Sequence, residues 1–141
     1  MEEHRSLRAE KCNCFALRRG ARLATNLYDE RLKPTGLRIT QFLALVAIQD
    51  SPGLSVNGLA EQLDLDRTTA GNNLLVLERD GLIRVTRSAR DAKTKVIELT
   101  RLGEDRVGEA MPLWRSAQQE LEEIMQSALP ALRSALDRAQ A

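Results

Sequence analysis

The chain has 141 residues and a formal net charge of +1, with 43% hydrophobic, 29% charged and only 3% aromatic residues. This length and composition predict one globular domain and exclude a disordered chain, and no apolar run reaches the roughly 18 residues of a membrane helix. The polar N-terminus shows no signal-peptide pattern, and two cysteines one residue apart form no disulfide framework, so a cytoplasmic protein is expected.

Helical periodicity characterises the first third of the chain. Apolar residues that recur every three or four positions predict a helix over about 7–33, and Pro34 follows it as a stop signal. A second helix is expected over 40–50, with Thr40 as its N-cap.

Two shorter helices are expected next, each introduced by a capping side chain. Ser55 should cap a helix over 56–63 and Asp66 a helix over 67–80, because an N-cap oxygen can accept from a free backbone N–H of the first turn. The short connection between these helices predicts a helix-turn-helix.

The periodicity then changes from helical to strand-like. Apolar and polar residues alternate over 83–87 and, less regularly, over 96–100, with a polar and charged segment between them. This pattern predicts a hairpin with a charged tip. Because an isolated hairpin is only marginally stable, it must pack on the preceding helices.

Two further helices are expected in the C-terminal part. Thr100 should cap a long helix over 101–126, in which apolar residues form a narrow seam suited to another helix. Pro112 lies within this helix and should bend it, because proline lacks the N–H of one helical hydrogen bond. Ser127 should begin the last helix, where Pro130 is tolerated in the first turn.

This order of elements predicts a mainly α fold with a small two- to three-stranded β-wing. Within a single domain of residues 1–141, the segment 37–100 is interpreted as a winged helix-turn-helix lobe, and 1–36 with 101–141 as a helical layer. The apolar stripes of the helical layer lack a partner, so a homodimer is expected. The expected dimer contacts are Leu17, Ala21, Trp114, Leu121, Leu132 and Leu136.

The helix expected over 67–80 has a distinctive polar side, formed by Arg67, Thr68, Thr69, Asn72 and Asn73. These side chains carry hydrogen-bonding groups suited to base edges and phosphates in a major groove. Gly71 lowers helix stability by about 1 kcal/mol relative to alanine, and a close approach of the backbone to DNA would explain it. The alternative is a solvated helix face with an incidental glycine.

The small net charge conceals an uneven distribution along the chain. Residues 1–38 and 66–101 are net basic, whereas 39–65 and 102–141 are net acidic. A positive surface at the expected helix-turn-helix and wing is therefore compatible with a total of +1, although solvated helix faces would give a similar alternation.

Five short segments follow one another in an order and spacing that match a known family. They are 36–42 (GLRITQF), 59–63 (LAEQL), 77–83 (LERDGLI), the wing from Arg87 to Asp91, and 99–103 (LTRLG). From about Leu37 to Arg101 the sequence thereby resembles the MarR (multiple-antibiotic-resistance regulator) family of bacterial winged-helix repressors, and the flanking helices fit the same family.

The resemblance implies a homodimer that binds a pseudo-palindromic operator, with helix 67–80 in a major groove and the wing in a flanking minor groove. The family wing usually carries Asp-x-Arg, but this chain has Asp91-Ala92-Lys93. Asn72 stands where relatives often carry arginine, and it is expected to bind adenine. The wing residues expected to contact DNA are Arg87, Arg90, Lys93 and Lys95.

The segment Cys12-Asn13-Cys14 lies near the start of the first expected helix. With Tyr28 it resembles the organic-hydroperoxide-sensing members of the same family, which implies an oxidisable cysteine and tyrosines that hydrogen-bond its thiolate across the dimer. Cys12 is a poor partner for Cys14 within the helix, because residues two apart point to opposite sides. The alternative is that Cys14 is a small core residue.

No enzyme, cofactor or metal site is expected, because the nucleotide-binding, hydrolase and zinc motifs are absent and His4 is the one histidine. The resemblance implies a small aromatic or anionic effector, for which Arg22, Arg38 and Arg115 are the basic candidates. Two alternatives stay open. One is a winged helix that binds protein partners, and the other is a thiol- or metal-responsive protein without operator binding.

Overall fold

The computed structural model describes residues 8–91 and 93–140. Its helices are α1 (Asn13–Leu32), α2 (Ile39–Asp50), α3 (Val56–Gln62), α4 (Arg67–Arg79), α5 (Arg101–Met125) and α6 (Ala128–Gln140), with short 3-10 turns at Ala9–Lys11 and Lys33–Thr35. The strands β1 (Ile83–Arg87) and β2 (Lys95–Leu99) form an antiparallel hairpin between α4 and α5. The mainly α fold with a small β-wing is therefore confirmed.

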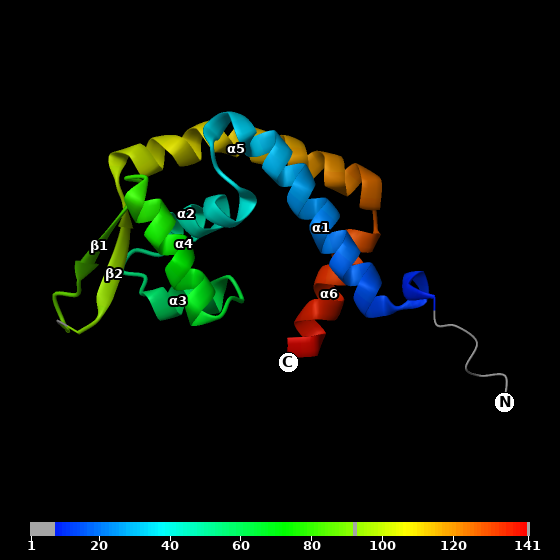
Figure 1. Ribbon diagram of the computed structural model, residues 1–141, viewed down its shortest axis with the longest axis horizontal. Coiled ribbons are helices and arrows are strands. Elements are labelled where there is room, and N and C mark those ends of the chain that lie inside the picture. The colour runs from blue at the N-terminus through cyan, green and yellow to red at the C-terminus, as the bar shows by residue number, and fades with distance from the viewer. Residues whose placement is uncertain (1–7, 92, 141) are drawn as a thin grey trace.

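The elements form two parts that α5 connects. Figure 1 shows the helix-turn-helix and the hairpin at one end of α5, and α1 beside its other half, where α6 turns back. α5 stays helical through Pro112 and is bowed in Figure 1, while a bend at Pro112 itself stays a prediction. None of the helices in the described ranges combines the length and apolar character needed to cross a membrane.

One hydrophobic core joins the two parts, with α2 near its centre. Phe42 and Leu45 of α2 are buried among Leu77 of α4, Ile97 of β2 and residues of α5. Burying a side chain of this size contributes about 1.5–3 kcal/mol. The hairpin is therefore held by the core that the helices share.

Trp114 of α5 takes part in this core. Its ring stacks on that of Phe42, with centroids 6.2 Å apart and planes inclined by 29°. Such aromatic pairs add roughly 0.5–1.5 kcal/mol to the effect of burial. Trp114, which was expected at a dimer contact, thus already packs within its own chain.

Three predicted caps are confirmed, and each uses a side-chain oxygen to accept from a free N–H of the first helical turn. Ser55 begins α3, Asp66 begins α4 and Thr100 begins α5. The distances from cap oxygen to backbone nitrogen are 3.0 Å to Gly58, 2.7 Å to Thr69 and 3.1 Å to Gly103, respectively.

The prediction of Thr40 as the cap of α2 is wrong, because the helix already begins at Ile39. The Ile39 N–H donates to the Asp29 carboxylate of α1 at 2.7 Å, and the Arg38 N–H donates to the Gln41 side chain at 2.9 Å. A residue distant in sequence therefore satisfies the first turn of α2, and the local pattern did not reveal it.

The first α-helix also begins later than predicted. The 3-10 turn precedes Cys12, which is extended (φ −78°, ψ 124°), and α1 starts at Asn13. The predicted start at residue 7 lies outside the described residues. The expected third strand is reduced to an isolated bridge between Ser55 and Val96.

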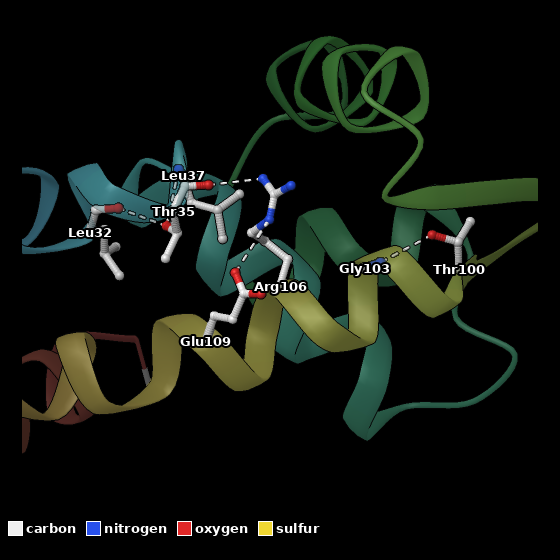
Figure 2. A network of polar contacts seen from close by, with 7 residues as sticks. All are labelled: Leu32, Thr35, Leu37, Thr100, Gly103, Arg106 and Glu109. Atoms are coloured by element: carbon white, nitrogen blue, oxygen red, sulfur yellow. Dashed lines mark hydrogen bonds and ion pairs between the residues drawn. The ribbon is translucent and has the colours of Figure 1, made fainter.

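Arg106 of α5 fixes the turn between α1 and α2 (Figure 2). Its guanidinium donates to the Thr35 carbonyl at 2.8 Å. The Thr35 hydroxyl in turn donates to the Leu32 carbonyl at 2.7 Å and accepts from the Leu37 N–H at 3.3 Å. Gly36 completes this turn in the left-handed conformation (φ 74°), which glycine adopts without strain. These contacts set the position of α2, and with it the lobe, relative to α5.

Candidate nucleic-acid interface

An open groove of about 650 Å³ lies between α4 and the hairpin. Arg67, Thr68 and Asn72 line it from α4, and Arg87 and Lys95 line it from the two strands. The groove thus has basic and hydrogen-bonding side chains on both walls, since Thr86 also lines it from β1, and Glu78 is the one acidic side chain among the described residues that line it. Duplex DNA matches this combination, because its phosphates attract the basic side chains and its base edges offer hydrogen-bond donors and acceptors.

The remaining predicted α4 residues do not line the groove. Thr69 donates its hydroxyl to Asp66 at 2.9 Å, so it supports the cap of α4. Asn73 is half-buried, on a different side of the helix from Asn72 because successive residues are 100° apart. For both residues, contact with DNA stays a prediction.

The carboxylate of Asp66 orders the start of α4. It accepts from the backbone N–H and from the hydroxyl of Thr69, at 2.7 and 2.9 Å. These two hydrogen bonds to the charged form hold the pKa of Asp66 below its ordinary value of 3.8. The first turn of the helix that lines the groove is therefore fixed by an anionic cap.

Replacing Asp66 by alanine is expected to lower the thermal midpoint of unfolding by about 4 °C at pH 7, because a helix N–H loses its acceptor. The folded pKa lies below the unfolded one, so this stabilisation is full above pH 3.8 and disappears as the pH falls through the folded pKa. Melting curves at pH 7 and pH 3 check this. Asp66→Asn keeps an acceptor without the charge, so its midpoint should fall less than that of Asp66→Ala at pH 7. If the difference in midpoint between the wild type and Asp66→Ala were the same at pH 7 and pH 3, the role of the charge in the cap would be contradicted.

The tip of the hairpin is organised by Asp91. Its carboxylate accepts from the Lys93 N–H and from the Thr94 hydroxyl, each at 3.0 Å, and these bonds lower its pKa. Ser88 accepts from the Arg90 N–H at 3.2 Å. Arg90 and Lys93 are exposed beside these hydrogen bonds, outside the groove.

The groove is also lined by residues that were not predicted as site residues, which are Leu75 and Glu78 of α4, Thr86 of β1 and the apolar Val56, Leu74 and Val85. Leu75 lies beside core leucines in the sequence, yet its side chain is 65% exposed. The buried stripe of α4 is Ala70, Leu74 and Leu77. A helical-wheel count would have separated Leu75 from it, because Leu75 lies about 100° from Leu74.

The single chain does not bring Cys14 and Tyr28 together. Both lie on α1, and 14 residues at a rise of 1.5 Å place them about 21 Å apart. The buried Tyr28 hydroxyl donates to Gln118 of α5. Its pKa is raised by burial and by Glu122, against an opposing effect of Arg133.

The thiols themselves are accessible. Cys14 is exposed and Cys12 half-buried, so the alternative that Cys14 is a core residue is wrong within one chain. Cys12 and Cys14 do not lie two apart on one helix, as was predicted, because Cys12 is the extended residue before α1. Among the described residues, no group of three or more histidine, cysteine or acidic side chains could hold a metal ion.

The basic effector candidates are not gathered in one place. Arg38 lines a second groove, of about 380 Å³, at the turn between α1 and α2, together with Asp29 and Lys33. Arg22 and Arg115 are exposed and do not line it.

The predicted dimer residues fall into two groups. Leu17, Ala21 and Leu136 are exposed, with 56% of Leu17 and 52% of Leu136 accessible. Trp114, Leu121 and Leu132 are half-buried within the chain. Leu23 and Ile124 add to the exposed apolar surface of α1 and α5. These exposed apolar residues lie on the helices of the predicted dimer layer, and their contacts across a dimer stay a prediction.

A helix-turn-helix followed by a hairpin, with a basic groove between them, defines a winged-helix protein. The family model described as "MarR family" matches residues 35–94. M. tuberculosis MosR, solved in complex with DNA, is 39% identical, with a TM-score of 0.82 over 92% of this chain and 94% of that one. The chain belongs to the MarR family.

Two other relatives are informative. The organic hydroperoxide resistance transcriptional regulator of Bacillus subtilis (strain 168) is 33% identical over 97 residues, which are 69% of this chain and 66% of that protein. The match thus spans just under two thirds of that relative. The repressor CouR, solved on a 23-mer DNA duplex, is 25% identical, with a TM-score of 0.83 over 94% of each chain. CouR from Rhodococcus jostii RHA1 has also been solved with p-coumaroyl-CoA.

Proposed function

We propose that this chain is a sequence-specific DNA-binding transcriptional regulator that acts as a homodimeric repressor in the cytoplasm and has no catalytic role. The observation that carries the proposal is the groove between α4 and the hairpin, with Arg67 on one wall and Arg87 and Lys95 on the other. The DNA complexes of MosR and CouR support it.

In this proposal each protomer places α4 in a major groove and the hairpin tip over a flanking minor groove. Phosphate contacts from the basic side chains supply affinity and fix the register, while Thr68 and Asn72 read base edges. Asp91 contributes by ordering the tip that carries Lys93. The exposed apolar faces of α1, α5 and α6 hold the protomers together, which sets the spacing of the two α4 helices.

Selection from a pool of random DNA duplexes tests this function. We expect a pseudo-palindrome whose half-site centres are about 34–36 Å apart, bound by two protomers. Failure to select any operator, together with binding that does not respond to salt, would contradict DNA recognition. That result would favour a winged helix that binds protein partners.

Lys93→Ala should weaken operator binding about equally across sequences and reduce the salt dependence of affinity. Each phosphate contact contributes roughly 0.9 to the slope of log K against log salt, so a dimer should lose about 2. Binding isotherms at several salt concentrations measure the slope. Lys33→Ala, which removes another exposed lysine at the α1–α2 turn, should leave the slope unchanged. If Lys93→Ala kept the wild-type slope of log K against log salt, Lys93 would not contact a phosphate and this assignment of the hairpin tip would be wrong.

Two release signals are proposed for the repressor. One is a small aromatic or anionic effector, supported by the p-coumaroyl-CoA complex of CouR. The other is oxidation of the exposed Cys14, supported by the similarity to the hydroperoxide resistance regulator. In that step the Cys14 thiolate attacks the terminal oxygen of an organic hydroperoxide and the O–O bond breaks. The OH group stays on sulfur as a sulfenic acid, and the leaving alkoxide takes a proton from water and departs as an alcohol.

If Cys14 is the sensor, an organic hydroperoxide should release the wild-type protein from its operator and leave Cys14→Ser bound. Gel-shift titration with the hydroperoxide measures this, and Cys12→Ser separates the two thiols. Equal behaviour of the wild-type protein and Cys14→Ser would exclude oxidation of Cys14 as the signal.

A further inference from the structure

Leu75 is an exposed apolar residue in a groove that is lined by basic, polar and apolar side chains. It lies on α4 three positions after Asn72, so the two side chains occupy neighbouring places on one face. Its side chain is 65% exposed, and both residues line the groove between α4 and the hairpin. Leu75 therefore does little for the core and has a surface available for a partner.

The charges around Leu75 indicate what that partner is. Arg67 lies on the same helix, and Arg87 and Lys95 lie across the groove. Glu78, three positions after Leu75, is the one acidic side chain among the described lining residues, so the groove is net positive and favours a polyanion. The base edges of a DNA major groove expose one apolar group, which is the C5-methyl group of thymine. The amide of Asn72, one helical turn away, matches the N6 and N7 atoms of adenine.

We propose that Leu75 packs against the C5-methyl group of a thymine in each operator half-site, beside an adenine bound by Asn72. This inference rests on the proposed DNA-binding function and adds a specificity-determining residue to it. It predicts that A·T pairs occupy the positions read by the exposed face of α4.

Operators in which deoxyuridine replaces thymidine test the contact, because uracil pairs like thymine and lacks only the methyl group. Removing one buried methyl group corresponds to roughly a fourfold loss of affinity, so replacement in both half-sites should weaken wild-type binding about fifteenfold. Leu75→Ala should bind the thymine operator more weakly by at least this factor and should no longer distinguish thymine from uracil.

The comparison of the two proteins controls for changes in DNA shape. If uracil acted through DNA flexibility, Leu75→Ala would stay sensitive to the replacement, and the proposal would be overturned. Leu43→Ala is the matched control: it removes a 41% exposed leucine from α2 that does not line the groove, and it should keep the wild-type response.

The outcomes also separate this inference from the function on which it rests. If no operator can be selected, DNA recognition itself fails. If an operator is selected but replacing each thymine of the half-sites by uracil leaves the wild-type affinity unchanged, the proposed DNA-binding function is retained and the Leu75 contact is wrong.

Discussion

Replacing Gly103 by alanine is expected to lower the free energy of unfolding by about 3 kcal/mol or more. Gly103 lies in the first turn of α5, and a Cβ atom there would come within 2.1 Å of the Leu82 carbonyl oxygen and 3.1 Å of its carbonyl carbon. Both atoms belong to the backbone, so no side-chain rotation relieves the clash. The same Leu82 carbonyl accepts from the Thr100 N–H at 3.1 Å, and moving it would weaken that bond too.

Gly108→Ala provides a matched control in the same helix. Its Cβ atom would meet nothing within 4 Å, and alanine is favoured over glycine in a helix by about 1 kcal/mol, so this variant should be more stable than the wild type. Urea unfolding at one fixed protein concentration measures both, since a dimer's stability depends on concentration. Destabilisation of both variants to the same extent would contradict the role given to the Leu82 contact.

This contact explains a glycine that sequence analysis could only recognise as part of a family segment. The order of helices and hairpin could be predicted because periodicity is written locally in the sequence. The caps at Ser55, Asp66 and Thr100 could also be predicted, since each accepts from the backbone N–H of the residue three positions later. Gly103 depends on its approach to Leu82, which no local pattern encodes.

Contacts between residues that are distant in sequence also explain why Thr40 was wrongly predicted as a cap. Thr40 is a good capping residue by type, but the carboxylate of Asp29, on another helix, satisfies the start of α2 instead. The link from Arg106 to Thr35 joins residues 71 positions apart and was likewise invisible in the sequence.

The candidate interface could likewise be predicted only in part from the sequence. Its basic and polar side chains could be named from the sequence, because they follow from residue type and helix position. Which of them line the groove could not be predicted. Arg67, Thr68 and Asn72 line it, whereas Thr69 supports the cap of α4. That difference depends on where the hairpin packs against α4.

Gly71→Ala is expected to make the protein more stable and a weaker DNA binder at once. Gly71 lines the groove from α4, and a Cβ atom there would meet nothing within 4 Å. The folded chain therefore offers no packing reason for glycine, and alanine should stabilise the helix by about 1 kcal/mol. If DNA occupies that space, the added methyl group collides with it in both half-sites and costs about 2 kcal/mol in total, or roughly thirtyfold in affinity.

Opposite changes in stability and affinity are what distinguish a functional glycine from an incidental one. Urea unfolding and operator titration of the same Gly71→Ala preparation measure the two quantities. Gly108→Ala again serves as the control, since it should gain stability without losing affinity, and so excludes helix rigidity as the cause of weaker binding. If Gly71→Ala bound the operator as tightly as the wild type, the backbone of α4 could not lie close to DNA at this position, and another face of the helix would have to read the operator.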